Sequence, residues 1–297
     1  MENKIDLHMH SFYSEDGEFS PKELVDQCAA LGIQTMSITD HNCVRANLEG
    51  ARFAAAKGMK YIPGVELDCT FEGVNLHVLG YDIDFQSEDF YRIEQNIENQ
   101  SFEASRKRLL AFQELGYHVT ENDLAALEKE HYWKGRWTGE MFAEILLSRP
   151  EYMQDKKLLP YREGGSRSDN PYVNFYWDFC SQGKICYAPI EFPSLQEVEK
   201  LIHHIDGIAV LAHPGENLKN HKALLQPILD TGLDGIEVFS SYHSEEDILY
   251  YNEAAEQRKL IITCGSDYHG KIKPAITLGN QTITKNLTDN INKWFNR

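Results

Sequence analysis

The stretch KIDLHMHSFYSEDG, residues 4–17, begins as an apolar strand, places two histidines at its end and continues into an acidic, hydroxyl-rich turn. Successive side chains of a strand point to opposite faces, so His8 and His10 project to one side and Met9 projects to the other. Two imidazoles on one face suit a single metal ion. Because histidines near strand ends are often only hydrogen-bonded polar residues, this pair needs support from the rest of the chain.

Other predicted strands also end in ionisable side chains. These strands, each with the side chains it carries, are TMSITDH (Asp40 and His41), YIPGVEL (Glu66), VNLHVLGYDID (His77), IAVLAHP (His213) and LIITCGSDYH (Asp267 and His269). In parallel βα architectures the carboxyl ends of the strands meet at one rim, where active sites are built. We therefore expect these histidines and carboxylates to face a common mouth.

Helical patterns alternate with the strands, as expected for βα units around a parallel sheet. The first helix is predicted to start at Ser20, which is followed by a proline at the first helical position and by Glu23, the partner in a capping box. The apolar stripe predicted to face the core comprises Leu24, Val25, Cys28 and Leu31.

The alternation is interrupted in the middle of the chain. Long helical segments and a stretch rich in Gly, Arg, Tyr and Trp replace the short strands, and the alternation resumes near residue 190. This pattern indicates an α/β barrel, residues 1–90 and 190–297, that carries a mostly helical insertion, residues 91–189. Because long excursions in compact domains are commonly lids or binding elements, we expect the insertion to take part in ligand recognition.

The composition is acidic. The 297 residues include 46 acidic and 29 basic side chains, so the formal net charge is −17 and a surface for duplex DNA is not expected. A small anionic ligand would need local help from metal ions or a few arginines. No stretch approaches about 20 apolar residues and the N-terminus has no signal-peptide pattern, so we expect no membrane association and a cytoplasmic location. The six cysteines form no CxxC pair, which favours reduced thiols in the core.

The order of the motifs resembles that of a known family. DLHMH, TDH, GVEL with the downstream LHVLGY, LAHP, GIEV and GSDYH together resemble the polymerase and histidinol phosphatase (PHP) superfamily, and most closely its stand-alone phosphoesterase branch. That branch includes nucleotide phosphatases and a 5′-to-3′ exoribonuclease. The resemblance covers nearly the whole chain outside the middle of the insertion. It implies a distorted (β/α)₇ barrel that holds up to three metal ions.

The resemblance also implies which side chains hold the ions. The nine ligands divide into a first set of His8, His10, Glu66 and Asp267, a second set of Glu66, His77 and His213, and a third set of Asp16, His41 and His269. Glu66 belongs to two sets and is expected to bridge two ions.

Two positions near these ligands depart from the family pattern. The turn after the HxH pair is one residue longer than is common, so Glu15 is an alternative to Asp16 as the ligand, and we favour Asp16. Asn42 follows TDH where an aspartate is common, which concerns the surroundings of the ligands rather than the ligands themselves.

The ligand types indicate the metal and the chemistry. Imidazole nitrogens and carboxylate oxygens, without a thiolate, fit two or three divalent ions such as Mn²⁺, Fe²⁺ or Zn²⁺ better than a soft-metal site or a calcium site. Clustered divalent ions lower the pKa of a shared water and neutralise phosphate oxygens, which allows in-line attack of hydroxide on phosphorus. The sequence therefore predicts a metal-dependent phosphoesterase.

Arg136 is a candidate for binding substrate or for catalysis, because a planar guanidinium can clamp a phosphate oxygen. It belongs to Gly135-Arg136, which resembles a Gly-Arg-Pro-His stretch of relatives, although Trp137 and Thr138 replace the last two residues. Lys184 is a weaker candidate. Both charges are also compatible with solvated surface positions, which is the interpretation we favour for Lys184.

Two further features concern the substrate. His243, just after the predicted strand GIEVF, lies on the expected rim and is a candidate for binding substrate and protonating the leaving group, although a histidine at a helix cap or on the surface fits equally well. The aromatic run YVNFYWDF, residues 172–179, is predicted to belong mainly to the core of the insertion, with one aromatic at its edge able to stack on a nucleobase.

Three functions remain open at this point. The leading hypothesis is hydrolysis of phosphomonoesters of nucleotides: a nucleoside monophosphate, a 3′,5′-bisphosphate or a short RNA 5′ end. The second is hydrolysis of histidinol phosphate or another small phosphomonoester. The third is a metal-dependent module that binds nucleotide without turnover, and the complete ligand set argues against it.

Overall fold

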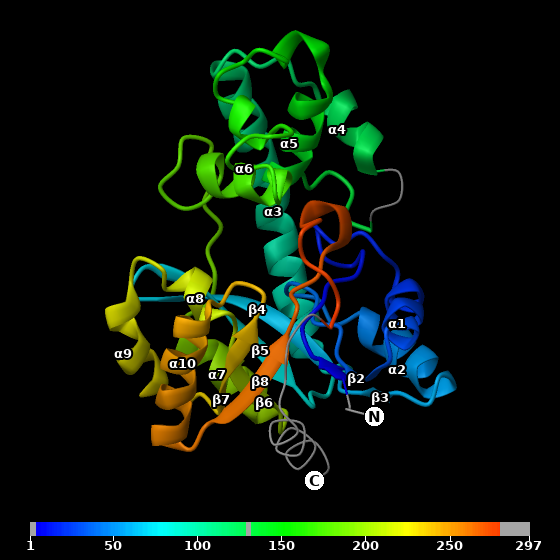
Figure 1. Ribbon diagram of the computed structural model, residues 1–297, viewed down its shortest axis with the longest axis vertical. Helices are drawn as coiled ribbons and strands as arrows, with labels where there is room; N and C mark the ends of the chain where they lie inside the picture. Colours follow the sequence, from blue (N-terminus) through cyan, green and yellow to red (C-terminus); the bar gives the residue numbers. More distant parts are fainter. Residues whose placement is uncertain (1–3, 129–131, 280–297) are drawn as a thin grey trace.

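The computed structural model describes residues 4–128 and 132–279, and Figure 1 shows a lower part with two β-sheets and an upper, helical part. The strands are β1 (Lys4–Asp6), β2 (Ile33–Met36), β3 (Lys60–Tyr61), β4 (Gly64–Phe71), β5 (Val74–Tyr81), β6 (Ile208–Leu211), β7 (Gly235–Ser240) and β8 (Ile261–Gly265). The helices are α1 (Pro21–Ala30), α2 (Ala46–Ala56), α3 (Glu88–Glu114), α4 (Glu121–Leu127), α5 (Gly139–Ser148), α6 (Pro171–Phe179), α7 (Leu195–His204), α8 (Pro214–Asn217), α9 (Leu225–Leu229) and α10 (Glu245–Arg258).

Helix α1 begins as its sequence predicts. Ser20 Oγ accepts a hydrogen bond from the Glu23 backbone N–H at 3.2 Å, and the Glu23 carboxylate accepts one from the Ser20 N–H at 2.8 Å, so the capping box is confirmed. The predicted core residues that are buried are Leu24, Val25 and Cys28. The prediction for Leu31 is wrong: the helix ends at Ala30, and Leu31, at the C-cap, is 46% exposed.

The first sheet is parallel, with β2 between β1 and β3. Helices α1 and α2 pack on it, and the core between them includes Met9, Ile33 and Met36. Because β1 and β2 run in the same direction, the residues that follow them emerge at one edge of the sheet. These residues carry the HxH pair and the TDH motif.

The second sheet has the order β4-β5-β6-β7-β8, and its parallel neighbours are the pairs β6–β7 and β7–β8. Two residues separate β4 from β5, Glu72 with a φ of 48° and Gly73 with a φ of 81°. A two-residue turn joins only antiparallel strands, and positive φ angles are typical of its tight form. The expectation of one parallel sheet is therefore wrong for β5, which is antiparallel to both of its neighbours.

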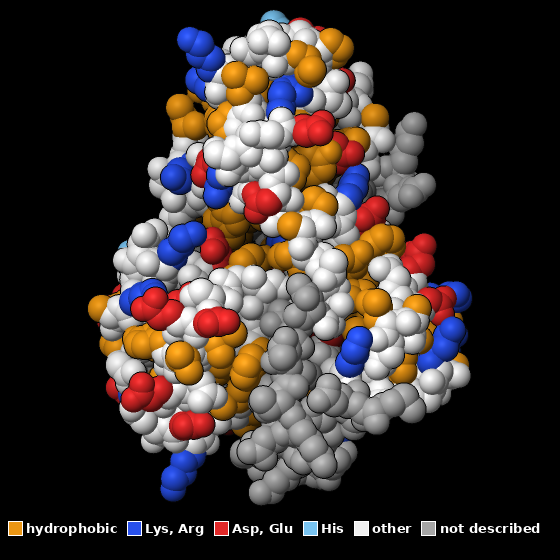
Figure 2. Space-filling model, in the orientation of Figure 1, with side chains coloured by type: hydrophobic (Ala, Val, Ile, Leu, Met, Phe, Trp, Pro, Cys, Tyr) orange, Lys and Arg blue, Asp and Glu red, His pale blue; other side chains and the backbone are white. Residues whose placement is uncertain are grey.

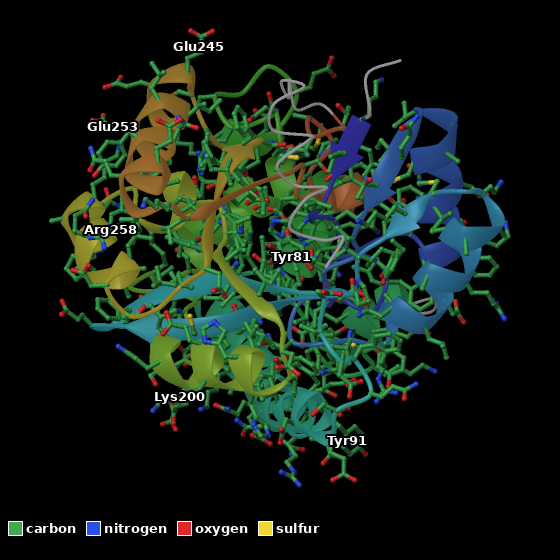
Figure 3. All side chains as sticks on the ribbon, turned by 90° about the horizontal axis from the view of Figure 1, so that it is seen from below. Tyr81, Tyr91, Lys200, Glu245, Glu253 and Arg258 are labelled. Carbon is green, nitrogen blue, oxygen red and sulfur yellow. The ribbon has the colours of Figure 1, made fainter. Side chains whose placement is uncertain are left out.

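Two isolated parallel bridges link the sheets, one between Met9 and Tyr268 and the other between His41 and Glu66. The α/β class is confirmed, but the sheets are not closed into the (β/α)₇ barrel that the resemblance implies, because bridges of single residues replace continuous ladders at both edges. Tyr81 is buried at the centre of the molecule (Figure 3), where its hydroxyl donates to the backbone oxygen of Leu7 at 2.9 Å.

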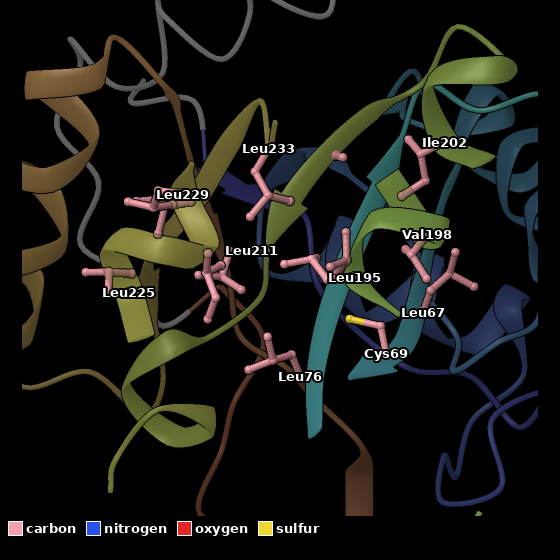
Figure 4. Close-up of a cluster of buried hydrophobic side chains, with 14 of the residues drawn as sticks. Leu67, Cys69, Leu76, Leu195, Val198, Ile202, Leu211, Leu225, Leu229 and Leu233 are labelled. Carbon is pink, nitrogen blue, oxygen red and sulfur yellow. The ribbon is translucent and has the colours of Figure 1, made fainter. Parts of the chain in front are cut away.

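A large apolar core supports the second sheet. Figure 4 shows side chains of β4, β5 and β6 packed against α7 and α9, namely Leu67, Cys69, Leu76, Leu195, Val198, Ile202, Leu211, Leu225 and Leu229. Burial of one such aliphatic side chain stabilises the fold by about 1.5–3 kcal/mol. This core fixes the strands from which three of the predicted ligands project.

Helix α3 belongs to two cores. Phe90, near its start, is buried in the core of the second sheet, whereas Phe112, near its end, is buried in a separate core of the upper part. There the Phe112 ring stacks on Phe142 of α5 and Phe175 of α6, with centroids 4.6 and 5.6 Å apart. The helix therefore ties the upper, helical part to the sheets, and the boundary predicted at residue 91 lies inside it.

The six cysteines are all free and buried, as expected for reduced thiols in the core. No helix in residues 4–128 and 132–279 is long and apolar enough to cross a membrane.

Candidate metal centre

The continuations of β1 and β8 run side by side and position three of the predicted ligands. The backbone N–H of His10 donates to Tyr268 O at 2.9 Å, and that of Asp267 donates to His8 O at 2.8 Å. His8 and His10 thus project from one continuation and Asp267 from the other. Asp267 has a φ of 56°, a conformation that is costly for a residue other than glycine and is frequent at functional sites.

The four side chains of the predicted first set converge on one point. His8 Nε2 lies 3.2 Å from His10 Nε2, 3.1 Å from Glu66 Oε2 and 3.2 Å from Asp267 Oδ1. His10 Nε2 lies 3.2 Å from the same Glu66 oxygen and 3.0 Å from the same Asp267 oxygen. Four ligands held tetrahedrally about 2.0 Å from one ion are about 3.3 Å from one another. The four atoms therefore have the spacing of a metal site.

Glu66 presents its two oxygens to different histidines. Oε1 lies 2.9 Å from both His77 Nδ1 and His213 Nε2. Oε2 lies 3.2 Å from His41 Nδ1, in addition to its contacts with the first set. A carboxylate with imidazoles at both oxygens is arranged as a bridge between two ions.

The third set lies beside the first. Potential ligand atoms of His10, Asp16, His41 and His269 all lie within 4.8 Å of one another, and Asp16 Oδ2 is 3.2 Å from His269 Nε2. Glu15 points elsewhere, with its Oε1 3.5 Å from Arg136 Nη1. The structure thus brings Asp16, and not Glu15, to the other predicted ligands.

Unpartnered polar atoms indicate that this donor set fits metal ions. All nine predicted ligands lie in three overlapping groups of potential ligands. Six of their buried atoms have no hydrogen-bond partner: Asp16 Oδ1, His41 Nδ1, Glu66 Oε2, His213 Nδ1, Asp267 Oδ1 and His269 Nε2. Such atoms are rare and costly in a folded protein, and a divalent cation would satisfy several of them together.

Burial and the charges of neighbouring groups both shift the pKa values of this cluster. Burial raises the pKa of Glu66, but the surrounding histidines, His8 first, outweigh it and hold the pKa well below its usual value. Burial, and then the charges of neighbouring imidazoles, lower the pKa of His10 to about 4. Burial would lower the pKa of His77, but the carboxylates of Glu66 and Asp68 raise it to about 10. A cation would replace the protons on such histidines, so metal binding here releases protons.

Glu237 is a site residue that sequence reasoning missed. Its Oε1 lies 3.0 Å from His8 Nδ1, and its Oε2 accepts a hydrogen bond from the His213 backbone N–H at 2.9 Å. A carboxylate behind an imidazole fixes the ring and leaves the other nitrogen for a metal. The acidic residue in the strand GIEV was a signal for this role, but the sequence did not show which ligands it contacts.

Ser14 and Asp40 hold His10 in a similar way. Ser14 Oγ lies 2.9 Å from His10 Nδ1 and donates to Asp40 Oδ1 at 3.2 Å. Asp40 also accepts hydrogen bonds from the N–H and hydroxyl of Ser11 at 2.6 and 2.7 Å. Burial raises the pKa of Asp40 to about 7. The acidic turn thus orients one ligand in addition to supplying another.

Lys273 and Tyr242 hold the Asp267 side chain in place. The sequence predicted neither residue. Lys273 Nζ lies 2.6 Å from Asp267 Oδ2, and the Tyr242 hydroxyl donates to the same oxygen at 2.6 Å. The other oxygen, Oδ1, is left to face the histidines. Neither contact has a sequence signal, because both residues lie outside the strand-end motifs.

Two adjoining cavities open beside the ligands. The smaller, about 200 Å³, extends from Asp16 and His41 to Arg136 in the upper part. The larger, about 970 Å³, lies between the upper part and the second sheet, and His77 and Trp177 line both cavities. The surface is hollowed where the two parts meet (Figure 2). A substrate held here would contact the upper part while its reacting group lies at the ligand cluster.

Arg136 is not a solvated surface charge. It is 4% exposed, and its guanidinium lies 3.2 Å from the centroid of the Trp133 ring and close to Glu15. Burial lowers its pKa. Lys184, by contrast, is exposed at the edge of the larger cavity.

His243 lines the larger cavity, but both of its ring nitrogens bond to the backbone. Nδ1 donates to Val238 O at 2.7 Å, and Nε2 accepts from the Gly215 N–H at 2.9 Å. Burial lowers the pKa of His243. A neutral imidazole has one N–H, and Val238 accepts it, so the structure does not support His243 as a proton donor or substrate ligand. The ring instead fixes two loops.

The fold and the clustered ligands define a class of metal-binding α/β protein, and comparison with known proteins identifies the family. The PHP domain model matches residues 6–297, so the chain belongs to the PHP domain family. This confirms the resemblance that the strand-end motifs indicate.

Several curated relatives are similar over most of their length. The chain is 27% identical over 268 residues to a 3′,5′-nucleoside bisphosphate phosphatase of Chromobacterium violaceum, an alignment that covers 89% of this chain and 87% of the relative. It is 29% identical over 269 residues to a phosphoribosyl 1,2-cyclic phosphate 1,2-diphosphodiesterase of Eggerthella lenta (90% and 94%), and 28% identical over 285 residues to the 5′-3′ exoribonuclease Rnm of Salmonella typhimurium (92% and 87%). All three are phosphoesterases, which confirms the predicted enzyme class.

Solved structures share the fold. A protein of Bifidobacterium adolescentis named as a metal-dependent phosphoesterase superposes with a TM-score of 0.78 at 24% identity, over 99% of this chain and 96% of that one. An amidohydrolase of Chromobacterium violaceum, solved with bound sulfate and without metal, superposes with a TM-score of 0.76 at 24% identity, over 97% and 96%.

Proposed function

We propose that this protein hydrolyses phosphomonoesters of nucleotides, with two or three divalent ions held by the nine predicted ligands. The observation that carries the proposal is the convergence of six buried, unpartnered nitrogens and oxygens from five strands or turns on one cluster, beside cavities that lead to an arginine and to aromatic side chains. The names of the relatives, a phosphatase, a diphosphodiesterase and an exoribonuclease, support hydrolysis of phosphate esters, and the phosphatase supports a monoester substrate.

The ligand sets assign a task to each part of the cluster. When bound, the divalent ions would activate a water molecule and neutralise the oxygens of the scissile phosphate. Glu66 spaces the first two sites, and Asp16 and His269 hold the third beside the smaller cavity. Glu237, Ser14 and their partners keep the imidazoles fixed, so that little reorganisation accompanies the reaction.

The walls of the cavities suit a nucleotide. Tyr176 and Trp177, from α6, line both cavities, whereas Phe175 of the same helix is buried in the core of the upper part. This division fits the expectation for the run 172–179, in which core aromatics neighbour a side chain that can stack on a base. Arg136 lies where it could reach a phosphate near the third ligand set.

Turnover of a substrate panel tests this function. Protein loaded separately with Mn²⁺, Zn²⁺ and Fe²⁺ should show its highest kcat/KM with a nucleoside monophosphate, a 3′,5′-bisphosphate or a short 5′-phosphorylated RNA. Histidinol phosphate serves as the competing substrate, and Asp267→Asn protein prepared in parallel reports contaminating phosphatases. Preference for histidinol phosphate, or nucleotide binding without turnover, would replace the proposal with one of the other two hypotheses.

Arg136→Ala is expected to lower kcat/KM for 3′,5′-bisphosphates by about 10- to 100-fold and to affect monophosphates far less. A charge-assisted hydrogen bond to the remote phosphate is worth about 1.5–3 kcal/mol, which corresponds to this loss. Steady-state kinetics on matched substrates measure the difference, and Arg92→Ala, on the exposed face of α3, is the control. An equal loss of kcat/KM on both substrates would place Arg136 at the scissile phosphate. No loss on either substrate would mean that Arg136 has only a structural role.

A further inference from the structure

We propose that Asp68 and Asn42 form a positioning pair that determines which nitrogen of His77 faces Glu66. The inference rests on the metal centre of the proposed function, but it concerns ion binding and is measured without substrate. Neither residue belongs to the nine predicted ligands.

Asp68 contacts the nitrogen of the His77 ring that faces away from Glu66. His77 Nε2 lies 2.9 Å from Asp68 Oδ1, while Nδ1 lies 2.9 Å from Glu66 Oε1. The three residues lie on the hairpin β4–β5, where Asp68 and His77 are directly paired across the strands. An ionised Asp68 accepts a hydrogen bond from Nε2, so this nitrogen keeps its proton, and when a cation replaces the proton on Nδ1 the Nδ1 lone pair would face the ion beside Glu66.

Asn42 in turn fixes the Asp68 carboxylate. The Asn42 side-chain amide donates to Asp68 Oδ2 at 2.5 Å, and Asn42 Oδ1 accepts the Asp68 backbone N–H at 3.0 Å. An amide can donate and accept in this way, whereas a carboxylate at position 42 would place two negative charges in contact. Asn42 has a φ of 52°, in the left-handed region that asparagine tolerates better than most residues.

The pair acts across a junction of the two sheets. The Asn42 N–H donates to Glu66 O at 2.7 Å, so the loop after β2 is bound to the strand that carries both Glu66 and Asp68. Asp68 also lines both cavities, so the contact lies at the border of the ligand cluster and the substrate space. The orientation of His77 thus depends on a contact between two segments that are distant in the sequence.

Metal content measured after dialysis against graded chelator tests the pair. Asn42→Asp and Asp68→Asn should each lower the affinity of one ion by about 10- to 100-fold, so that one equivalent is lost at chelator concentrations that leave the wild type loaded. The other ions should remain, because the first and third ligand sets contain neither His77 nor Asp68. Asn96→Asp, which adds the same charge on the exposed face of α3, should behave as wild type.

Exchange of the two residues separates positioning from a general loss of structure. In the double variant Asn42→Asp with Asp68→Asn, the amide and the carboxylate change places, and the new side chain at position 68 still has an oxygen to accept from His77 Nε2. We expect the exchange to recover most of the lost affinity, with a coupling that neither single change predicts.

Three results would contradict the proposed positioning role of Asp68 and Asn42. The first is a wild-type metal affinity in both single variants, and the second is tighter binding in Asn42→Asp, which would make position 42 a ligand position. The third is a double variant as weak as the sum of the single ones. A wild-type protein that binds no divalent ion would instead overturn the proposed function, so the two failures are distinguishable.

Discussion

Glu66→Ala is expected to remove more than one equivalent of metal and to lower kcat/KM by roughly 10³-fold. Both carboxylate oxygens face imidazoles: Oε1 lies 2.9 Å from His77 and His213, and Oε2 lies 3.1 Å from His8. The change therefore takes a ligand from two ion sites at once. Elemental analysis of the purified variant, together with its turnover of the best substrate, measures both effects.

His269→Ala is the matched comparison for Glu66→Ala. His269 is fully buried, like Glu66, but its Nε2 faces Asp16 and belongs only to the third set. Its removal should empty one site and leave the ions at Glu66. Equal metal content in the wild type and in both variants would contradict the proposed cluster.

Asp16→Asn is expected to lower kcat by two or more orders of magnitude, whereas Glu15→Gln should stay within about threefold of the wild type. Asp16 Oδ2 faces His269, and Asp16 Oδ1 is buried without a partner, so loss of its charge weakens the third ion that would orient the phosphate. Glu15 faces Arg136 at 3.5 Å instead. Kinetics at saturating metal compare the two.

The ranking of the two variants decides the assignment. The two changes are isosteric and adjacent, and each removes one negative charge from the same turn, so they differ mainly in what the side chain contacts. If Glu15→Gln is the inactive variant, the structure has assigned the wrong carboxylate. Thermal unfolding of both metal-free proteins separates a loss of ligand from a loss of the fold.

Much of the site could be predicted from short stretches of sequence. The alternation of side chains along a strand places His8 and His10 on one face, and the strand-end positions of His41, Glu66 and Asp267 indicate a common rim. These local properties indicate the shared rim, whereas the full set of nine ligands is what the family resemblance implies, and potential ligand atoms of all nine lie in three overlapping groups in the structure. The same holds for the capping box at Ser20, whose hydrogen bonds join residues three apart.

Contacts between distant segments could not be predicted in this way. Glu237 behind His8 joins residues that are 229 positions apart, and Lys273 reaches Asp267 only because of the conformation of the chain after β8. From its position on the rim, His243 is a candidate for proton transfer, with a helix-cap or surface position fitting equally well. Its two nitrogens are instead taken by backbone groups of Val238 and Gly215.

The sequence by itself thus determined the elements, the strand ends that carry nitrogen and oxygen donors, and the family to which the chain belongs. Only the tertiary structure decided that the sheets do not close into a barrel, that Asp16 rather than Glu15 lies beside the other predicted ligands, and which groups hold His8 and His10. The physical reason is that strand periodicity and helix capping act between neighbouring residues. Hydrogen-bond partners and sheet closure depend instead on how segments far apart in the chain pack together.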